Sequence, residues 1–194
     1  MVNRQPKSRD TRSELRSAAI RLGVRDGIDA ASIRVIAREA GVTEGAVYKH
    51  FENKDHLIRD AYASIVLEMA RDKATLVKAD LPFAAAVRAW IKFTYQYFDG
   101  NRDAFTYVLL MPHRMADTLG DPYTIQGELF TELFTNAQNN NEIIRMDPEL
   151  ALTMFSGLVL GVPHKINDGS LNGPAEQYTD AIAEAVLRVF TSAL

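Results

Sequence analysis

The side chains with the clearest chemistry lie in residues 43–50, which read TEGAVYKH. In a helix that starts near residue 44, Ala46, Val47 and Phe51 fall on one side, which leaves the polar residues on the other. The outward set is Thr43, Glu44, Gly45, Tyr48, Lys49 and His50. The first three suit base edges in a major groove, because the amino-terminal end of such a helix approaches them, and the last three offer donors to flanking phosphates. This segment therefore favours binding to duplex DNA.

Two further basic residues lie at the starts of neighbouring expected helices. Lys54 falls in a first turn, where unpaired backbone N–H groups and the helix dipole favour an anion. Arg34 lies early in the second expected helix, which precedes residues 43–50. We expect both to bind phosphates, and a basic amino-terminal arm with Arg4, Lys7 and Arg9 could reach the DNA backbone or a minor groove. Taken singly, each of these side chains could instead be solvated or paired with an acid.

The elements that would position these residues follow from apolar spacing and capping residues. Leu15, Ala18, Ala19 and Leu22 form the stripe of an amphipathic helix that ends at Gly27. Ser32, Thr43 and Asn53 are expected caps of the three following helices. Gly41 is expected in a left-handed conformation between the second and third helices. This arrangement predicts a helix-turn-helix.

Residues 32–57, SIRVIAREAGVTEGAVYKHFENKDHL, resemble the signature of the tetracycline-repressor (TetR) family of transcriptional regulators. The matching features are Ile36-Ala37, the Ala40-Gly41-Val42 turn, residues 45–48, and Phe51 followed by Lys54 and Leu57. Two residues depart from expectation. Val35 stands where the family often has an acid that would complete a capping box with Ser32, and Glu44 places a negative charge near DNA.

The resemblance implies an all-α fold with an N-terminal three-helix helix-turn-helix domain, residues 1–53, and a larger helical effector-binding and dimerisation domain, residues 54–194. It also implies a repressor that binds a palindromic, double-stranded operator as a homodimer and is released by a small hydrophobic effector. The apolar spacing agrees with helices near residues 101–116, 122–139, 147–166 and 174–192.

Residues 83–134 hold most of the aromatic side chains, and an apolar cavity among them would suit a ligand. The expected lining residues are Trp90, Phe93, Tyr97, Tyr107, Met111, His113 and Phe130. The alternative is that these side chains form a solid core. In that case the chain would be a DNA-binding regulator without a small-molecule effector.

The last two expected helices carry apolar faces and closely spaced glycines that suit a dimer interface. Asp147-Pro148 starts the first of them, and Gly157 and Gly161 would let two helices approach closely. A four-helix bundle built by two subunits would use Met154, Gly157, Leu158, Gly161, Ile182, Val186 and Val189. Packing within one subunit is the alternative.

The composition of the chain argues against several other classes of protein. The chain has 194 residues, no cysteine and a net charge of -3, but residues 1–60 hold 12 Lys and Arg against 9 Asp and Glu. A basic amino-terminal part suits DNA, and the lack of cysteine agrees with a cytoplasmic protein. The histidines lack metal-ligand spacing, and no nucleophile motif, phosphate loop or membrane-spanning run is present. We therefore expect no metal, cofactor or membrane association, and an all-helical enzyme is the remote alternative.

Overall fold

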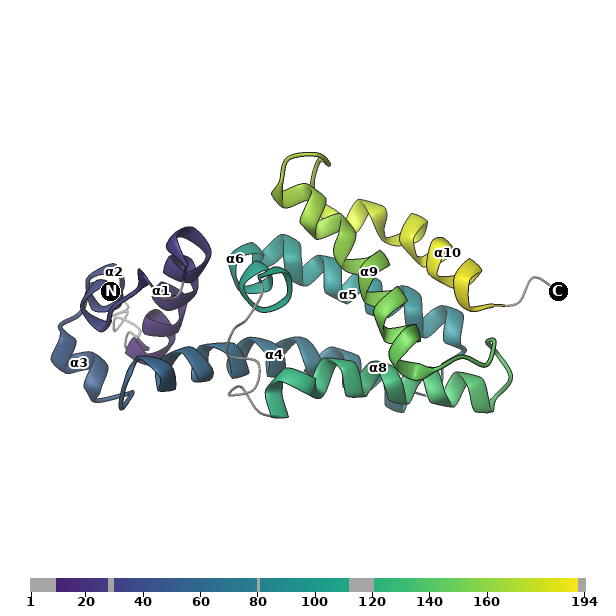
Figure 1. Ribbon diagram of the computed structural model, residues 1–194, viewed down its shortest axis with the longest axis horizontal. Helices are drawn as coiled ribbons and strands as arrows, with labels where there is room; N and C mark the ends of the chain where they lie inside the picture. Colours follow the sequence, from purple (N-terminus) through teal and green to yellow (C-terminus); the bar gives the residue numbers. More distant parts are fainter. Residues whose placement is uncertain (1–9, 28–29, 80, 112–120, 192–194) are drawn as a thin grey trace, which may run out of the picture. The chain divides into compact units, whose positions relative to one another are not determined.

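The computed structural model describes residues 10–27, 30–79, 81–111 and 121–191, and within these ranges it is helical and contains no β-strand (Figure 1). The all-α prediction is confirmed. The chain divides into two compact units, residues 1–62 and 63–194, so the division falls inside helix α4 (Lys54–Lys78). The domain boundary expected after residue 53 coincides with the start of α4, and Leu57 in the first turn of this helix belongs to the amino-terminal core.

The first unit contains α1 (Thr11–Asp26), α2 (Ile33–Ala40), α3 (Glu44–Tyr48) and the start of α4. All three expected caps are present. The Ser32 and Thr43 hydroxyls accept the backbone N–H groups of Val35 and Ala46 at 3.3 Å, and Asn53 Oδ1 accepts that of His56 at 2.8 Å. Gly41 has φ 68°, the left-handed conformation that a glycine adopts without strain.

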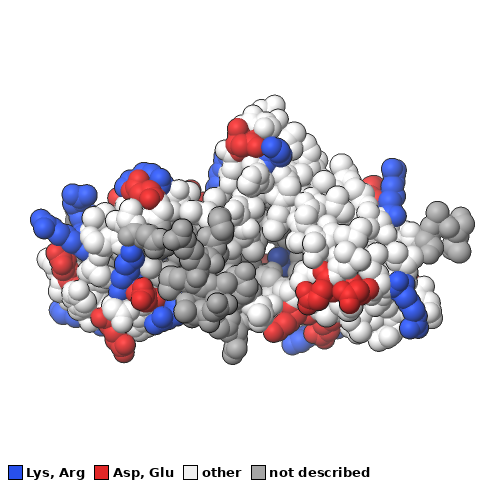
Figure 2. Space-filling model, viewed as in Figure 1, with Lys and Arg blue, Asp and Glu red and all other residues white. Residues whose placement is uncertain are grey.

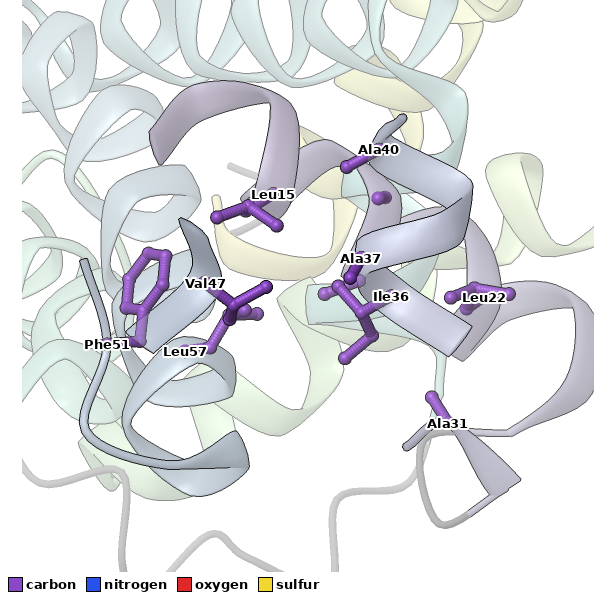
Figure 3. Close-up of a cluster of buried hydrophobic side chains, with 11 residues drawn as sticks. Leu15, Leu22, Ala31, Ile36, Ala37, Ala40, Val47, Phe51 and Leu57 are labelled. Atoms are coloured by element: carbon purple, nitrogen blue, oxygen red, sulfur yellow. The ribbon is translucent and has the colours of Figure 1, made fainter. Parts of the chain in front are cut away.

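The core of the first unit is small and fully apolar. Figure 3 shows Leu15 and Leu22 of α1, Ile36 of α2, Val47 of α3 and Phe51 in one cluster of buried side chains. Each of these side chains is at most 1% exposed. The core therefore fixes which side of α3 is buried.

The described part of the second unit contains the rest of α4 and seven shorter elements. In chain order these are α5 (Phe83–Gly100), α6 (Arg102–Phe105), the π-helix η2 (Thr106–Leu110), α8 (Asp121–Asn139), α9 (Pro148–Asn167), the 3₁₀-helix η3 (Ala175–Tyr178) and α10 (Thr179–Phe190). Helix α5 packs on α10, and α8 packs on α9. The helix expected near residues 101–116 consists of α6 and η2 as far as Leu110, and its end lies outside the described residues.

Aromatic side chains from separate helices build the core of the second unit. Phe130 of α8 stacks on Phe155 of α9 with ring centroids 4.4 Å apart, and Trp90 of α5 meets both rings edge-on. A second group joins Phe83, Phe134 and Phe190. The core of this unit is therefore assembled from helices that lie far apart in the sequence.

Candidate functional site

Helix α3 presents an exposed polar face. Val47 is fully buried and Phe51 is 1% exposed, whereas Tyr48 is 57% exposed. Thr43, Glu44, Gly45, Lys49 and His50 are exposed as well. The division of this helix into a buried and an outward side is therefore as predicted.

Arg34 and Lys49 are exposed basic residues of this unit, and neither forms an ion pair with any residue that the structure describes. Among the described residues, no carboxylate therefore neutralises either side chain. Lys54 differs, because it is half-buried and already engaged in an interaction within the protein. The proposed arm residues Arg4, Lys7 and Arg9 lie outside the described residues.

The arginines of α1 are engaged within the protein, which the charge count did not reveal. Arg12 and Arg16 pair with Asp60, Arg21 pairs with Glu39 at 3.1 Å, and Arg25 pairs with Asp26. The basic character of the amino-terminal part therefore overstates the charge that α1 offers to a partner.

Asp60 joins α1 to the start of α4. Its carboxylate accepts Arg12 Nη2 at 2.6 Å and Arg16 Nε at 2.5 Å, and the Arg12 guanidinium also lies over the Phe51 ring. Partial burial would raise the pKa of Asp60, but the hydrogen bonds from the two arginines outweigh it, and its pKa is lowered. The first turns of α4 are thereby tied to the helix-turn-helix.

The second unit contains an apolar cavity of about 100 Å³. Its lining comes from five elements and consists of Lys73, Trp90, Thr94, Leu109, Gln126, Gly127, Phe130, Leu152, Phe155, Ser156, Val159 and Leu160. A second, more polar pocket of about 220 Å³ is lined by Met69, Asp72, Lys73, Phe93, Thr94, Gln96 and Tyr97. Lys73 and Thr94 border both, so they form the wall between the two spaces.

The expected ligand-lining residues fall into separate groups. Trp90 and Phe130 line the apolar cavity, and Phe93 and Tyr97 line the polar pocket. Tyr107 and Met111 line neither of these two spaces. Tyr107 is instead 3% exposed, and burial raises its pKa to about 12. His113 lies outside the described residues.

Sequence reasoning missed Lys73, which is 4% exposed. A signal was present, because Lys73 continues the buried stripe of α4 formed by Ile65, Val66, Met69, Ala70, Leu76 and Val77. A charged residue inside an otherwise apolar stripe should have been singled out.

The residues expected at a dimer interface lie mostly on the surface of α9 and α10. Met154, Gly157 and Gly161 are exposed, and Leu158, Ile182 and Val189 are half-buried. Figure 2 shows few charged side chains over α9 between its two ends. Val186 is an exception to the expectation, because it is fully buried in the core of its own subunit and cannot contact a second one.

The described residues contain no group of three or more side chains that could hold a metal ion. No helix among them is long and apolar enough to cross a membrane.

The exposed α3 face on a helix-turn-helix, together with a separate helical domain that holds a cavity, defines a helix-turn-helix regulator. The family of bacterial regulatory proteins named tetR matches residues 15–61. The transcriptional regulator SrpR of Pseudomonas putida is 40% identical over 162 residues, which are 80% of this chain and 75% of SrpR. The chain belongs to the TetR family, and the resemblance in residues 32–57 is confirmed.

Other similar proteins match more narrowly or more distantly. The nicotine-responsive transcriptional repressor HdnoR of Paenarthrobacter nicotinovorans is 44% identical over 62 residues, which are 32% of this chain and 32% of HdnoR. The match to HdnoR therefore leaves about two thirds of that protein uncovered. The structure of FadR from Bacillus subtilis in complex with stearoyl-CoA has a TM-score of 0.79 at 14% identity, covering 91% of this chain and 97% of FadR. At this identity the likeness shows the fold alone.

Proposed function

We propose that the protein is a homodimeric transcriptional repressor that binds a palindromic operator through α3 and leaves it when a small, largely apolar effector binds the second unit. The observation that carries this proposal is the exposed polar face of α3, held on a fully buried core by Val47 and Phe51. Membership in the TetR family supports it.

Thr43, Glu44 and Gly45 approach base edges, because they form the amino-terminal end of the recognition helix. Tyr48, Lys49 and His50 contact the flanking phosphates, and Arg34 and Lys54 add phosphate contacts from the starts of α2 and α4. Glu44 offers only acceptors, so it favours a base amino group, such as that of cytosine, over the acceptor groups of the major groove.

The dimer uses α9 and α10 of each subunit. Leu150 and Met154 are large apolar residues that are 51% and 37% exposed, and Gly157 and Gly161 continue the same surface of α9. Half-buried Leu158, Ile182 and Val189 complete it. Two recognition helices in such a dimer would be separated by about 34 to 36 Å, one turn of DNA.

The effector enters the cavities of the second unit, and α4 carries the response because it is continuous from Lys54 to Lys78. A ligand that prefers one position of α4 shifts the population away from the DNA-binding state by no more than its differential affinity. HdnoR is described as nicotine-responsive and the FadR structure contains stearoyl-CoA, so effector binding occurs in proteins similar to this chain.

The DNA-binding proposal is tested by titrating labelled duplex DNA from beside the protein's own gene at several salt concentrations. Affinity should fall with salt, and Lys49→Ala should reduce the slope of log affinity against log salt by about one. Lys92→Ala removes an exposed lysine of α5 and should leave the slope unchanged. Affinity that ignores DNA sequence, and a Lys49→Ala slope equal to that of Lys92→Ala, would contradict the proposal.

The dimer is tested by light scattering on the purified protein. Met154→Arg places a charge on the proposed interface and should produce a monomer. Leu67→Arg changes a leucine of α4 that is 51% exposed and should leave the dimer intact. A monomeric wild type, or a dimer that tolerates Met154→Arg, would refute the proposed surface.

A further inference from the structure

Lys73 is a basic residue buried in the middle of the second unit. It lies on the apolar stripe of α4, is 4% exposed and borders both the apolar cavity and the polar pocket. Lysine is almost never buried to this extent unless its charge is paired. The packing of α4 therefore does not explain why a lysine is buried at this position.

The neighbours of Lys73 hold its ammonium group in place. Nζ donates to Gln126 Oε1 at 2.7 Å, and Gln126 Nε2 in turn donates to the Val66 carbonyl at 3.2 Å. This second bond fixes the amide so that its oxygen faces Lys73. The Trp90 ring lies beneath the ammonium, with 5.0 Å between Nζ and the ring centroid.

The two hydroxyl groups in the cavity lining already donate elsewhere. Thr94 Oγ1 donates to the Trp90 carbonyl at 2.8 Å, and Ser156 Oγ donates to the Thr153 carbonyl at 3.1 Å. An ammonium has three donors, whereas the described residues provide one hydrogen-bond acceptor to Lys73. Lys73 is therefore the cationic donor that the apolar cavity offers to a ligand.

The ammonium group of Lys73 forms no ion pair within the described part of the chain, and Asp72 is the carboxylate that borders the same polar pocket. Among the described residues, Lys73 is the only charged one that lines the apolar cavity. Burial lowers the pKa of Lys73 to about 7. A bound anion would supply the missing charge, since buried charges are stabilised by pairing and hydrogen bonding.

We infer that the apolar cavity binds a small apolar monocarboxylate, with its carboxylate on Lys73 Nζ and its hydrocarbon part among Trp90, Phe130 and Phe155. This inference rests on the proposed function, because it names the chemical class of the effector. The cavity measures about 100 Å³, and a second pocket of about 220 Å³ lies on the other side of Lys73 and Thr94.

Binding can be followed with the protein's own fluorescence. Trp90 is the only tryptophan in the chain, and its ring lines the cavity and contacts Lys73. The probes are two matched pairs, hexanoate with hexanamide and benzoate with benzamide, titrated to millimolar concentration into the full-length protein. The members of each pair have nearly the same shape and differ in charge.

The wild type should bind each carboxylate at least about tenfold more tightly than its amide, the difference expected for one hydrogen bond to a charged group. Lys73→Gln should remove that preference while leaving amide affinity within about twofold. Lys73→Met, which fits an apolar stripe and retains the fold, should do the same. Lys78→Gln removes an exposed lysine of the same helix and should behave as the wild type.

Three results would overturn the inference: equal affinity for carboxylates and amides, no binding of any probe, or a carboxylate preference that survives both Lys73 substitutions. Operator titration on the same preparations separates this failure from failure of the proposed function. Normal DNA affinity without carboxylate preference rejects only the role of Lys73. A wild-type protein that does not bind the DNA rejects the proposed function.

Discussion

The two units of this protein bury their side chains by different routes. In the first, Leu15, Ile36, Val47 and Phe51 come from one stretch of fewer than forty residues, and side-chain caps start α2, α3 and α4. In the second, rings from α5, α8, α9 and α10 meet across long intervals of sequence, and the packing leaves two cavities and a buried lysine. The first unit therefore has an apolar core that supports the exposed face of α3, and the second has a core that borders a cavity and a pocket.

This difference indicates where each unit holds its functional residues. Substitutions on the exposed face of α3 should affect binding but not stability, because those side chains contribute little to the core. Substitutions around Lys73 should affect both, because its neighbours are core residues as well as cavity walls. Substitutions in each unit therefore test whether binding and stability depend on separate residues in the first unit and on shared residues in the second.

The largest expected effect is loss of the first core by Phe51→Ala. Removing a fully buried phenylalanine should cost about 3 to 5 kcal/mol, a large share of the stability of a small domain. Trp90 lies in the second unit, so its fluorescence transition should change little while helical circular dichroism shows an earlier loss. A Trp90 transition that shifts as far as the circular dichroism would show that the units unfold together.

A smaller effect concerns pH and Lys73. Because burial lowers its pKa to about 7, the cost of burying the charge is present below that pH and disappears above the ordinary lysine value of about 10.4. The free energy of unfolding of the wild type should therefore rise with pH across this window, relative to Lys73→Met, by up to about 1.4 kcal/mol per pH unit. Asp72 is the charged residue that shares the polar-pocket lining with Lys73.

Urea unfolding followed by Trp90 fluorescence at several pH values between about 7 and 10 measures this difference. A wild-type minus Lys73→Met difference that stays constant with pH would mean that Lys73 keeps an ordinary pKa.

A still smaller loss of stability is expected at Asp60, which receives Arg12 and Arg16. Asp60→Asn leaves two arginines beside a neutral amide and should lower the free energy of unfolding by about 1 to 2 kcal/mol. Asp26→Asn is the matched control, because Asp26 pairs with its exposed neighbour Arg25, and it should cause little change. Equal effects of the two substitutions in thermal unfolding would contradict a special role for Asp60.

The sequence alone predicts the first unit better than the second. Ser32, Gly41, Thr43 and Asn53 were assigned correctly because caps and left-handed glycines depend on neighbours a few residues away. The engagement of Arg12 and Arg16 by Asp60 was not predicted, since it joins residues more than forty positions apart.

In the second unit, the roles of individual residues depend on packing between distant helices. Trp90 and Phe130 line the apolar cavity, whereas Tyr107 lines neither described pocket and Val186 lies in the core. Helical spacing tells which side of a helix is apolar, but not whether that side meets its own core, a cavity or a second subunit. Lys73 is an exception, because its position in the apolar stripe of α4 indicates from the sequence that it is buried.

The central claim, that the amino-terminal end of α3 approaches DNA closely, is tested most directly by Gly45→Leu. A Cβ at Gly45 meets no heavy atom closer than Thr43 Oγ1 at 4.0 Å, and leucine favours a helix more than glycine. The thermal midpoint should therefore not fall, while affinity for the DNA beside the gene should drop by about tenfold or more. Unchanged DNA affinity in this stable variant would contradict the claim.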